Sequence, residues 1–245
     1  NPTPAPNDLF GSALTFVGTH LLIGVRFDDI AGQNNAGSAY VIDPDSGAVV
    51  RAIPNPSPAP GDLFGFAVSA LGADLLVSAP EHDAGAARSG IVYRLDAATG
   101  AVLQAYTTSP PVAGAKLGFA LATLDGDVLA GAPYEGRAGR AYLFDGQSGT
   151  VRQTFPNPRA LSADLFGRAV AATAGIVVIA APYNDQAAVN AVWTPPVSIE
   201  CPVGSTPGLT MWKVKMSRSW PCSGPVARTT PRRTRRRRKP RDVSS

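Results

Sequence analysis

The hydrophobic residues of this chain fall into short blocks that return at a nearly constant spacing. A glycine opens each block, at Gly11, Gly65, Gly118 and Gly167, with intervals of 54, 53 and 49 residues. Each glycine is followed by a short apolar stretch, a tight turn and a longer apolar run. Periods of this length are typical of repeat architectures. The pattern therefore predicts four copies of one structural unit.

The longer apolar run of each copy predicts a strand that is buried on both faces. These runs cover residues 21–25, 75–80, 128–133 and 176–182. A strand that lies between two neighbouring sheets has no solvated face, so its residues do not alternate between apolar and polar. In the last three copies the run ends at a proline, which cannot donate a hydrogen bond to a sheet. These prolines are Pro80, Pro133 and Pro182.

In the first three copies two further strands follow the run and are joined by a tight turn, whereas the sequence of the fourth copy breaks off before them. In the first three copies the turn reads DPDSG, DAATG or DGQSG. The aspartate accepts local backbone hydrogen bonds and the glycine adopts a positive φ, which together favour a hairpin. Four short strands per copy, with no helix between them, predict an all-β fold of antiparallel β-propeller blades.

The proline-rich stretch PNPSPAPGD (54–62) is predicted to connect the outermost strand of one blade to the innermost strand of the next. Proline stiffens such a crossing and brings no donor that needs a partner, so this interpretation is preferred to a docking motif. The copies span about 1–54, 55–107, 108–157 and 158–192. Three complete repeats and a partial fourth predict an open or incomplete propeller.

The repeated motifs resemble a known family. Leu9-Phe10-Gly11, Leu63-Phe64-Gly65 and Leu165-Phe166-Gly167 match its Phe-Gly element, and Gly131-Ala132-Pro133 matches its Gly-Ala-Pro element. This arrangement over residues 1–192 resembles the FG-GAP repeats of integrin α-subunit propellers and of bacterial extracellular proteins. The resemblance implies an extracellular or cell-surface adhesion or ligand-binding module, usually with seven blades.

The chain departs from this family in its calcium loops. Integrin-type repeats often carry an acidic calcium loop between their first and second strands, whereas the connections here are tight turns. Only Asp125 and Asp127 resemble a remnant of such a loop. Calcium takes six to eight oxygen ligands, so two carboxylates are too few. Neither a metal nor another cofactor is predicted.

The composition changes abruptly after residue 192. Residues 1–196 contain 10 basic and 16 acidic residues, whereas residues 197–245 contain 12 basic and 2 acidic ones. All tryptophans, cysteines and methionines follow residue 192. The segment 193–245 is predicted to be a disordered basic tail. An altered reading frame near residue 190, a genuine tail that contacts polyanions and an accessory domain all remain open explanations.

The tail and the apolar runs bear on partners and location. Residues 235–239 would bind nucleic acid weakly and without specificity, and no specific nucleic-acid partner is predicted.

No apolar run approaches the roughly 18 residues of a membrane span. The chain starts at Asn1 without a leader peptide, which is typical of a processed segment. An extracellular or cell-surface location is expected from the resemblance, and the unpaired faces of the terminal blades favour self-association.

The sequence contains no recognisable catalytic pattern, and the protein is predicted not to be an enzyme. The candidate ligand-binding residues lie in the crossing loops and in the loops after the second strands, which share one face of a propeller. They are Asp28, Asp29, Glu81, His82, Asp83, Tyr134, Glu135, Arg137, Tyr183 and Asp185. Tyrosines with acids and amides suit a protein or carbohydrate ligand.

The predicted function is therefore non-catalytic recognition or adhesion through the propeller loops. A second hypothesis is a quinoprotein-like propeller enzyme, because YRLDAATGAVLQAY (93–106) resembles the blades of quinoprotein dehydrogenases, although residues 1–192 lack the tryptophans that those blades repeat. A third is an inactive scaffold fragment of a longer propeller protein.

Overall fold

The computed structural model describes residues 2, 6–158, 164–173, 176–183, 198–200 and 210–215. This part of the chain consists of strands and loops, and it contains no helix that could cross a membrane. The prediction of an all-β fold is confirmed.

Three antiparallel sheets of four strands form in the order of the sequence. The first sheet contains β1 (Ala13–Val17), β2 (His20–Val25), β3 (Ser38–Ile42) and β4 (Val49–Pro54). The second contains β5 (Val68–Leu71), β6 (Asp74–Ala79), β7 (Ile91–Leu95) and β8 (Val102–Tyr106). The third contains β9 (Leu121–Leu124), β10 (Asp127–Ala132), β11 (Arg140–Phe144) and β12 (Val151–Pro156). Each sheet is one predicted repeat, and we call it a blade.

The fourth sheet begins like the others but is completed differently. Its first two strands are β13 (Ala169–Thr173) and β14 (Ile176–Ala181). The next position is taken by β16 (Thr210–Lys215), and β15 (Ser198–Glu200) lies outside it. The partial fourth repeat thus supplies two strands, and two segments after residue 193 extend the sheet in exchanged order. The rest of the predicted basic tail lies outside the described residues.

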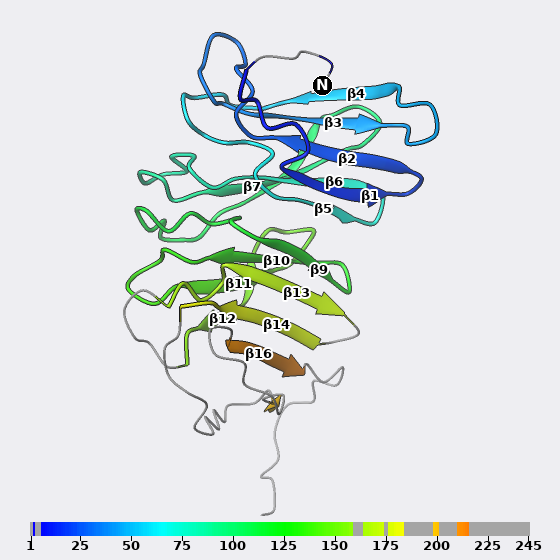
Figure 1. The fold of residues 1–245 in the computed structure, drawn as a ribbon. Coiled ribbons are helices and arrows are strands. Elements are labelled where there is room, and N and C mark those ends of the chain that lie inside the picture. The colour runs from blue at the N-terminus through cyan, green and yellow to red at the C-terminus, as the bar shows by residue number, and fades with distance from the viewer. Residues whose placement is uncertain are drawn as a thin grey trace, which may run out of the picture.

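The four blades follow one another as an open arc. The first strands of the blades contact each other in sequence, β1 with β5, β5 with β9 and β9 with β13, and so form the inner side of the arc. The first and fourth blades lie at opposite ends of the molecule (Figure 1). The prediction of an incomplete propeller is therefore confirmed.

The hydrophobic core is divided into three clusters that lie between consecutive blades. Leu75 faces the cluster between the first and second blades, whereas its neighbour Leu76 faces the cluster between the second and third. Both side chains are fully buried. Adjacent residues of one strand point to opposite faces, so this arrangement explains why the second strand of each repeat is apolar throughout.

The Phe-Gly element of the second and fourth blades, and Leu117-Gly118 at the same place in the third, contact the blade before them. Gly37, which precedes β3, pairs in parallel with Phe64, whose backbone N–H donates to the Ala36 carbonyl at 3.0 Å. Gly90 with Leu117, and Gly139 with Phe166, repeat this pairing. We call this contact the blade joint. The side chains of Phe64, Leu117 and Phe166 are buried there, so a large apolar residue at this position packs between consecutive blades.

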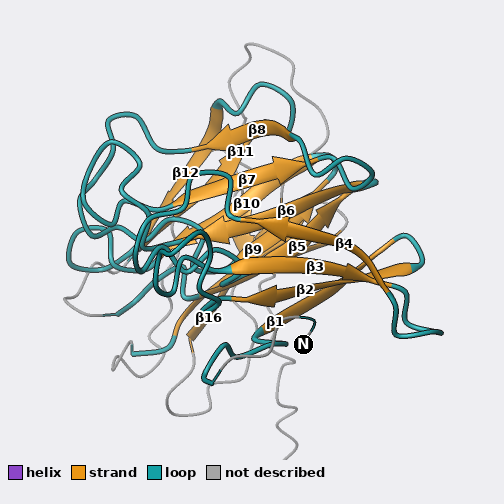
Figure 2. Cartoon of the chain, turned by 90° about the horizontal axis from the view of Figure 1, so that it is seen from above, coloured by secondary structure: helices purple, strands orange, loops and turns teal. Residues whose placement is uncertain are grey.

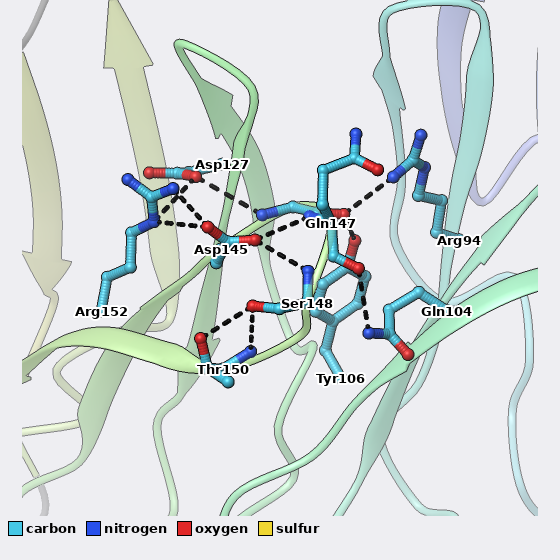
Figure 3. Close-up of polar contacts among 10 residues, drawn as sticks. Arg94, Gln104, Tyr106, Asp127, Asp145, Gln147, Ser148, Thr150 and Arg152 are labelled. Carbon is cyan, nitrogen blue, oxygen red and sulfur yellow. Dashed lines mark hydrogen bonds and ion pairs between the residues drawn. The ribbon is translucent and has the colours of Figure 1, made fainter.

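A second set of contacts ties the second and third blades together at the other end of the strands (Figure 3). The Gly146 carbonyl, in the turn after β11, accepts hydrogen bonds from the Tyr106 hydroxyl at 2.7 Å and from Arg94 Nη1 at 2.9 Å. Arg94 is held in turn by Asp74, 2.7 Å from its Nε. The turn glutamine Gln147 accepts from the side chain of Gln104 at 3.2 Å. The hairpin turn of one blade is therefore anchored on the strands of its neighbour.

The outer face of the first blade lacks the cover that the other blades have. Leu14 and Phe16 of β1 are 62% and 63% exposed. The corresponding residues of β5, Val68 and Ala70, pack against the cluster between the first and second blades. No other described blade packs on this face of β1, which leaves an apolar patch on the first blade.

Candidate functional site

The long loops of the blades gather at one end of the strands, and the short turns lie at the other (Figure 2). The connections from β2 to β3 and from β4 to β5 both lie at the long-loop end, as the antiparallel order of the strands requires. The arrangement agrees with the expectation that the crossing loops and the loops after the second strands share one face. We call it the loop face.

A pocket of about 480 Å³ opens on the loop face between the first and second blades. One wall is the crossing loop that leads to β5, and the other is the loop that follows β6. The lining residues are Ala59, Pro60, Gly61, Asp62, Leu63, Glu81, His82, Asp83 and Arg88. Five of these nine residues carry an ionisable side chain, which makes the pocket a polar site.

Asp62 supplies a buried carboxylate in the wall of the pocket, with an exposed fraction of 3%. One carboxylate oxygen accepts hydrogen bonds from the side chain of Asn55 at 2.9 Å and from the backbone N–H of Ala59 at 2.8 Å. The other lies 3.1 Å from His82 Nδ1, which is close enough for an ion pair when the imidazole is protonated. Burial raises the pKa of the nearby Tyr93 hydroxyl, and the negative charge of Asp62 raises it further.

Charged groups of both signs surround the pocket opening. Glu81 lies 2.6 Å from Lys116 Nζ and 3.8 Å from Arg88 Nε. The Arg88 side chain is 69% exposed, so most of its donors face solvent. Its backbone N–H donates to Asp83 Oδ1 at 2.7 Å, which fixes the loop between them. A ligand in the pocket would meet a guanidinium donor together with carboxylate acceptors.

The structure brings part of the predicted ligand-binding set together. Glu81, His82 and Asp83 line the pocket. Tyr134 of the third blade is connected to them through Lys116, whose Nζ lies 4.8 Å from the centre of the tyrosine ring. The tyrosine therefore extends the polar surface of the pocket toward the next blade.

Two of the predicted acidic residues form hydrogen bonds within their own blades. Asp28 is buried and accepts hydrogen bonds from the hydroxyls of Ser38 and of Tyr40, the latter at 3.4 Å. Glu135 is buried in the third blade and accepts from the Tyr142 hydroxyl at 2.7 Å. Burial, followed by this hydrogen bond, raises the pKa of Tyr142. Both carboxylates stabilise the loop that leads into the third strand.

The remaining predicted residues lie elsewhere on the loop face. Asp29 is exposed and accepts from the backbone N–H of Asn35 at 2.8 Å. Arg137 and Tyr183 are exposed on the loops of the third and fourth blades, and Asp185 lies outside the described residues. None of these residues lines the pocket.

The described residues contain no group of three or more histidine, cysteine, aspartate or glutamate side chains that could hold a metal ion. Asp127, considered as part of a calcium-loop remnant, lies 3.3 Å from Arg152 Nε. Burial raises its pKa, which disfavours the charged form that a metal would require.

Comparison with known proteins agrees with the repeated geometry. Residues 4–42 match the model of the FG-GAP repeat family. The first blade of the chain therefore contains an FG-GAP repeat. A search among curated proteins finds no match to it. The match in the first blade and the three four-stranded sheets together support a propeller-type module, and the blade joint accounts for the Phe-Gly element.

Sequence reasoning missed two of the five ionisable pocket residues, Asp62 and Arg88. A signal for Asp62 exists in the crossing loops, where an asparagine precedes an aspartate by seven residues at both Asn55–Asp62 and Asn157–Asp164. No pattern marks Arg88, because its position depends on how the loop after β6 folds against the crossing loop.

Proposed function

We propose that this protein is a non-catalytic extracellular recognition module that binds a polar protein or carbohydrate ligand on its loop face. The observation that supports the proposal is the pocket between the first and second blades. Its walls come from a crossing loop and from the loop after β6, which are the two loop types that a propeller presents on one face. Pockets with a few convergent polar groups are the usual form of a ligand site.

The chemistry of the lining residues favours binding over catalysis. Arg88 offers several donors and Asp83 offers acceptor oxygens, a combination that suits the hydroxyl groups of a sugar or the backbone of a peptide. His82 lies against the buried carboxylate of Asp62, which holds the imidazole in place. None of the nine described lining residues is a serine, threonine or cysteine, so they provide no nucleophile of that kind.

The test is a screen of the full chain against glycan and peptide arrays, followed by calorimetry with the best ligand. Arg88→Ala is expected to weaken binding about tenfold or more, because a hydrogen bond to a charged group is lost. Arg137→Ala is the matched control, since Arg137 is an exposed arginine on a loop of the third blade.

Equal effects of the two substitutions would exclude the pocket as the site. Tight retention of an added quinone cofactor, seen as co-eluting absorbance, would instead favour the quinoprotein-like enzyme.

A further inference from the structure

A row of four side chains, with an arginine at each end and two phenylalanines between them, crosses the four blades, one residue from each blade. Phe66 and Phe119 each follow the glycine of a Phe-Gly element, and their ring centres are 4.7 Å apart. The Arg26 guanidinium lies 5.1 Å from the centre of the Phe66 ring, and that of Arg168 lies 5.1 Å from Phe119. We call these four residues the arginine–phenylalanine row.

The two guanidinium groups of this row have no carboxylate partner among the described residues. Neither Arg26 nor Arg168 forms an ion pair there, unlike Arg88, Arg94 or Arg152. Arg26 also lies 5.1 Å from the ring of Phe27, so two aromatic rings hold its guanidinium. Its Nε is buried without a hydrogen-bond partner in the described part of the chain. A cation placed in this way retains its charge and most of its donors for an external anion.

The aromatic members of the row are accessible as well. Phe66 and Phe119 are half-buried, as are both arginines, so ring surface remains open to solvent between the two charges. Aromatic rings provide flat apolar surface against which the C–H faces of a sugar ring can pack. A guanidinium matches a carboxylate with two parallel hydrogen bonds. The spacing places apolar surface between two anion-binding ends.

We propose that the arginine–phenylalanine row is a second binding site, and that its ligand is an acidic carbohydrate of linked uronate sugars. The two arginines bind carboxylates of the chain, and the phenylalanine rings support the sugar between them. The proposal is independent of the pocket, because none of the four residues lines it. The nearby acid Glu81 is already neutralised by Lys116 at 2.6 Å, which limits its repulsion of such a ligand.

The experiment measures binding of trigalacturonate to the full chain by calorimetry at about 150 mM salt, where screening weakens purely electrostatic attraction. The double variant Arg26→Gln, Arg168→Gln is expected to lose about tenfold or more in affinity. Arg137→Gln is the matched control, because it removes the same charge from an exposed position outside the row. Thermal melting of each variant verifies that the blades remain folded.

The basic tail requires its own control, since it attracts polyanions without specificity. A variant with Arg235–Arg238 replaced by glutamine is expected to retain binding of the short ligand. Loss of binding in this tail variant, with binding intact in the double variant of the row, would overturn the proposal. Equal binding of neutral maltotriose, or stronger binding of a short polyglutamate peptide, would overturn the assignment to an acidic carbohydrate.

Discussion

The side-chain amide of Asn55 donates to the carboxylate of Asp62 at 2.9 Å, and both residues are buried. The same amide nitrogen donates to the Ala36 carbonyl at 3.1 Å, so the crossing loop is closed on itself and tied to the preceding blade. Asn157 and Asp164 repeat the pair at 2.7 Å before the fourth blade. The proline-rich connection between the first and second blades thus has a defined shape set by one polar pair.

Asn55→Ala is expected to lower the free energy of unfolding by roughly 1–3 kcal/mol, because it leaves buried acceptors without their donor. Urea denaturation of the full chain measures the change. Thr108→Ala is the control, since Thr108 occupies the equivalent buried position in the third copy, where Ala115 replaces the aspartate. Similar losses in both variants would show that the pair has no special role.

Gly37→Ala is expected to be far more destabilising than Gly47→Ala. Both glycines have a positive φ, 83° and 70°, so the backbone strain of the substitution is similar, about 1 kcal/mol or somewhat more. An added Cβ at Gly37 would collide with the backbone of Phe64 in the blade joint, whereas that at Gly47 meets open space. Thermal melting should separate the two variants clearly, and equal melting temperatures would contradict the importance of the joint.

Acid should destabilise the hairpin turns. Hydrogen bonds within the turns lower the pKa values of three aspartates. The main donor to Asp43 is the backbone N–H of Asp45, and the main donor to Asp96 is the side chain of Thr99. The main donor to Asp145 is the backbone N–H of Ser148. An aspartate whose pKa is lower in the folded than in the unfolded protein stabilises the fold at pH values above its unfolded pKa, about 3.9. This stabilisation is lost as the pH falls through the pKa of the folded protein. Stability should therefore decrease below about pH 4.

Urea midpoints at several pH values test this expectation. Asp145→Asn cannot titrate, so its midpoint should fall less steeply with acid than that of the unaltered chain. An unchanged slope in Asp145→Asn and in Asp96→Asn would contradict the assignment.

Phe16→Glu is expected to reduce self-association of the chain. Phe16 is 63% exposed beside Leu14 on the outer face of the first blade, and a charge there disfavours the burial of that face against another molecule. Sedimentation velocity over a range of protein concentrations measures the change. Leu103→Glu, at a 49% exposed position on the outer strand β8, serves as the control. If only the control reduced association, the outer strands rather than the terminal blade would be the contact.

The strands of the fold could be predicted closely from the sequence. The apolar run predicted at 75–80 is β6, Asp74–Ala79, and the run at 128–133 is β10, Asp127–Ala132. These strands are recognisable from local sequence, because a strand that is buried on both faces is a continuous apolar run and a proline marks its end. The hairpin turns were equally predictable, since an aspartate and a positive-φ glycine determine them.

The sites were less predictable because they depend on contacts between segments that are distant along the chain. Glu81, His82 and Asp83 were selected from their loop, but Asp62 joins them from the crossing loop that opens the same copy. The neighbours of Arg26 could not be foreseen either, since Phe66 lies 40 residues further along the chain and reaches it only through the packing of two blades. β15 and β16 were not predicted, because their sequences do not resemble the strands of the repeat.

The blade joint has a consequence for how such chains change over evolution. The second and third copies each carry a glycine ahead of their third strand and a Phe-Gly or Leu-Gly element ahead of their first, so each of these units presents both partners of the same contact. A gene duplication that inserts one whole unit would then create two correct junctions without any further substitution. The number of units can vary more freely than the sequence of a single unit, in which one misplaced methyl group at the glycine would break a junction.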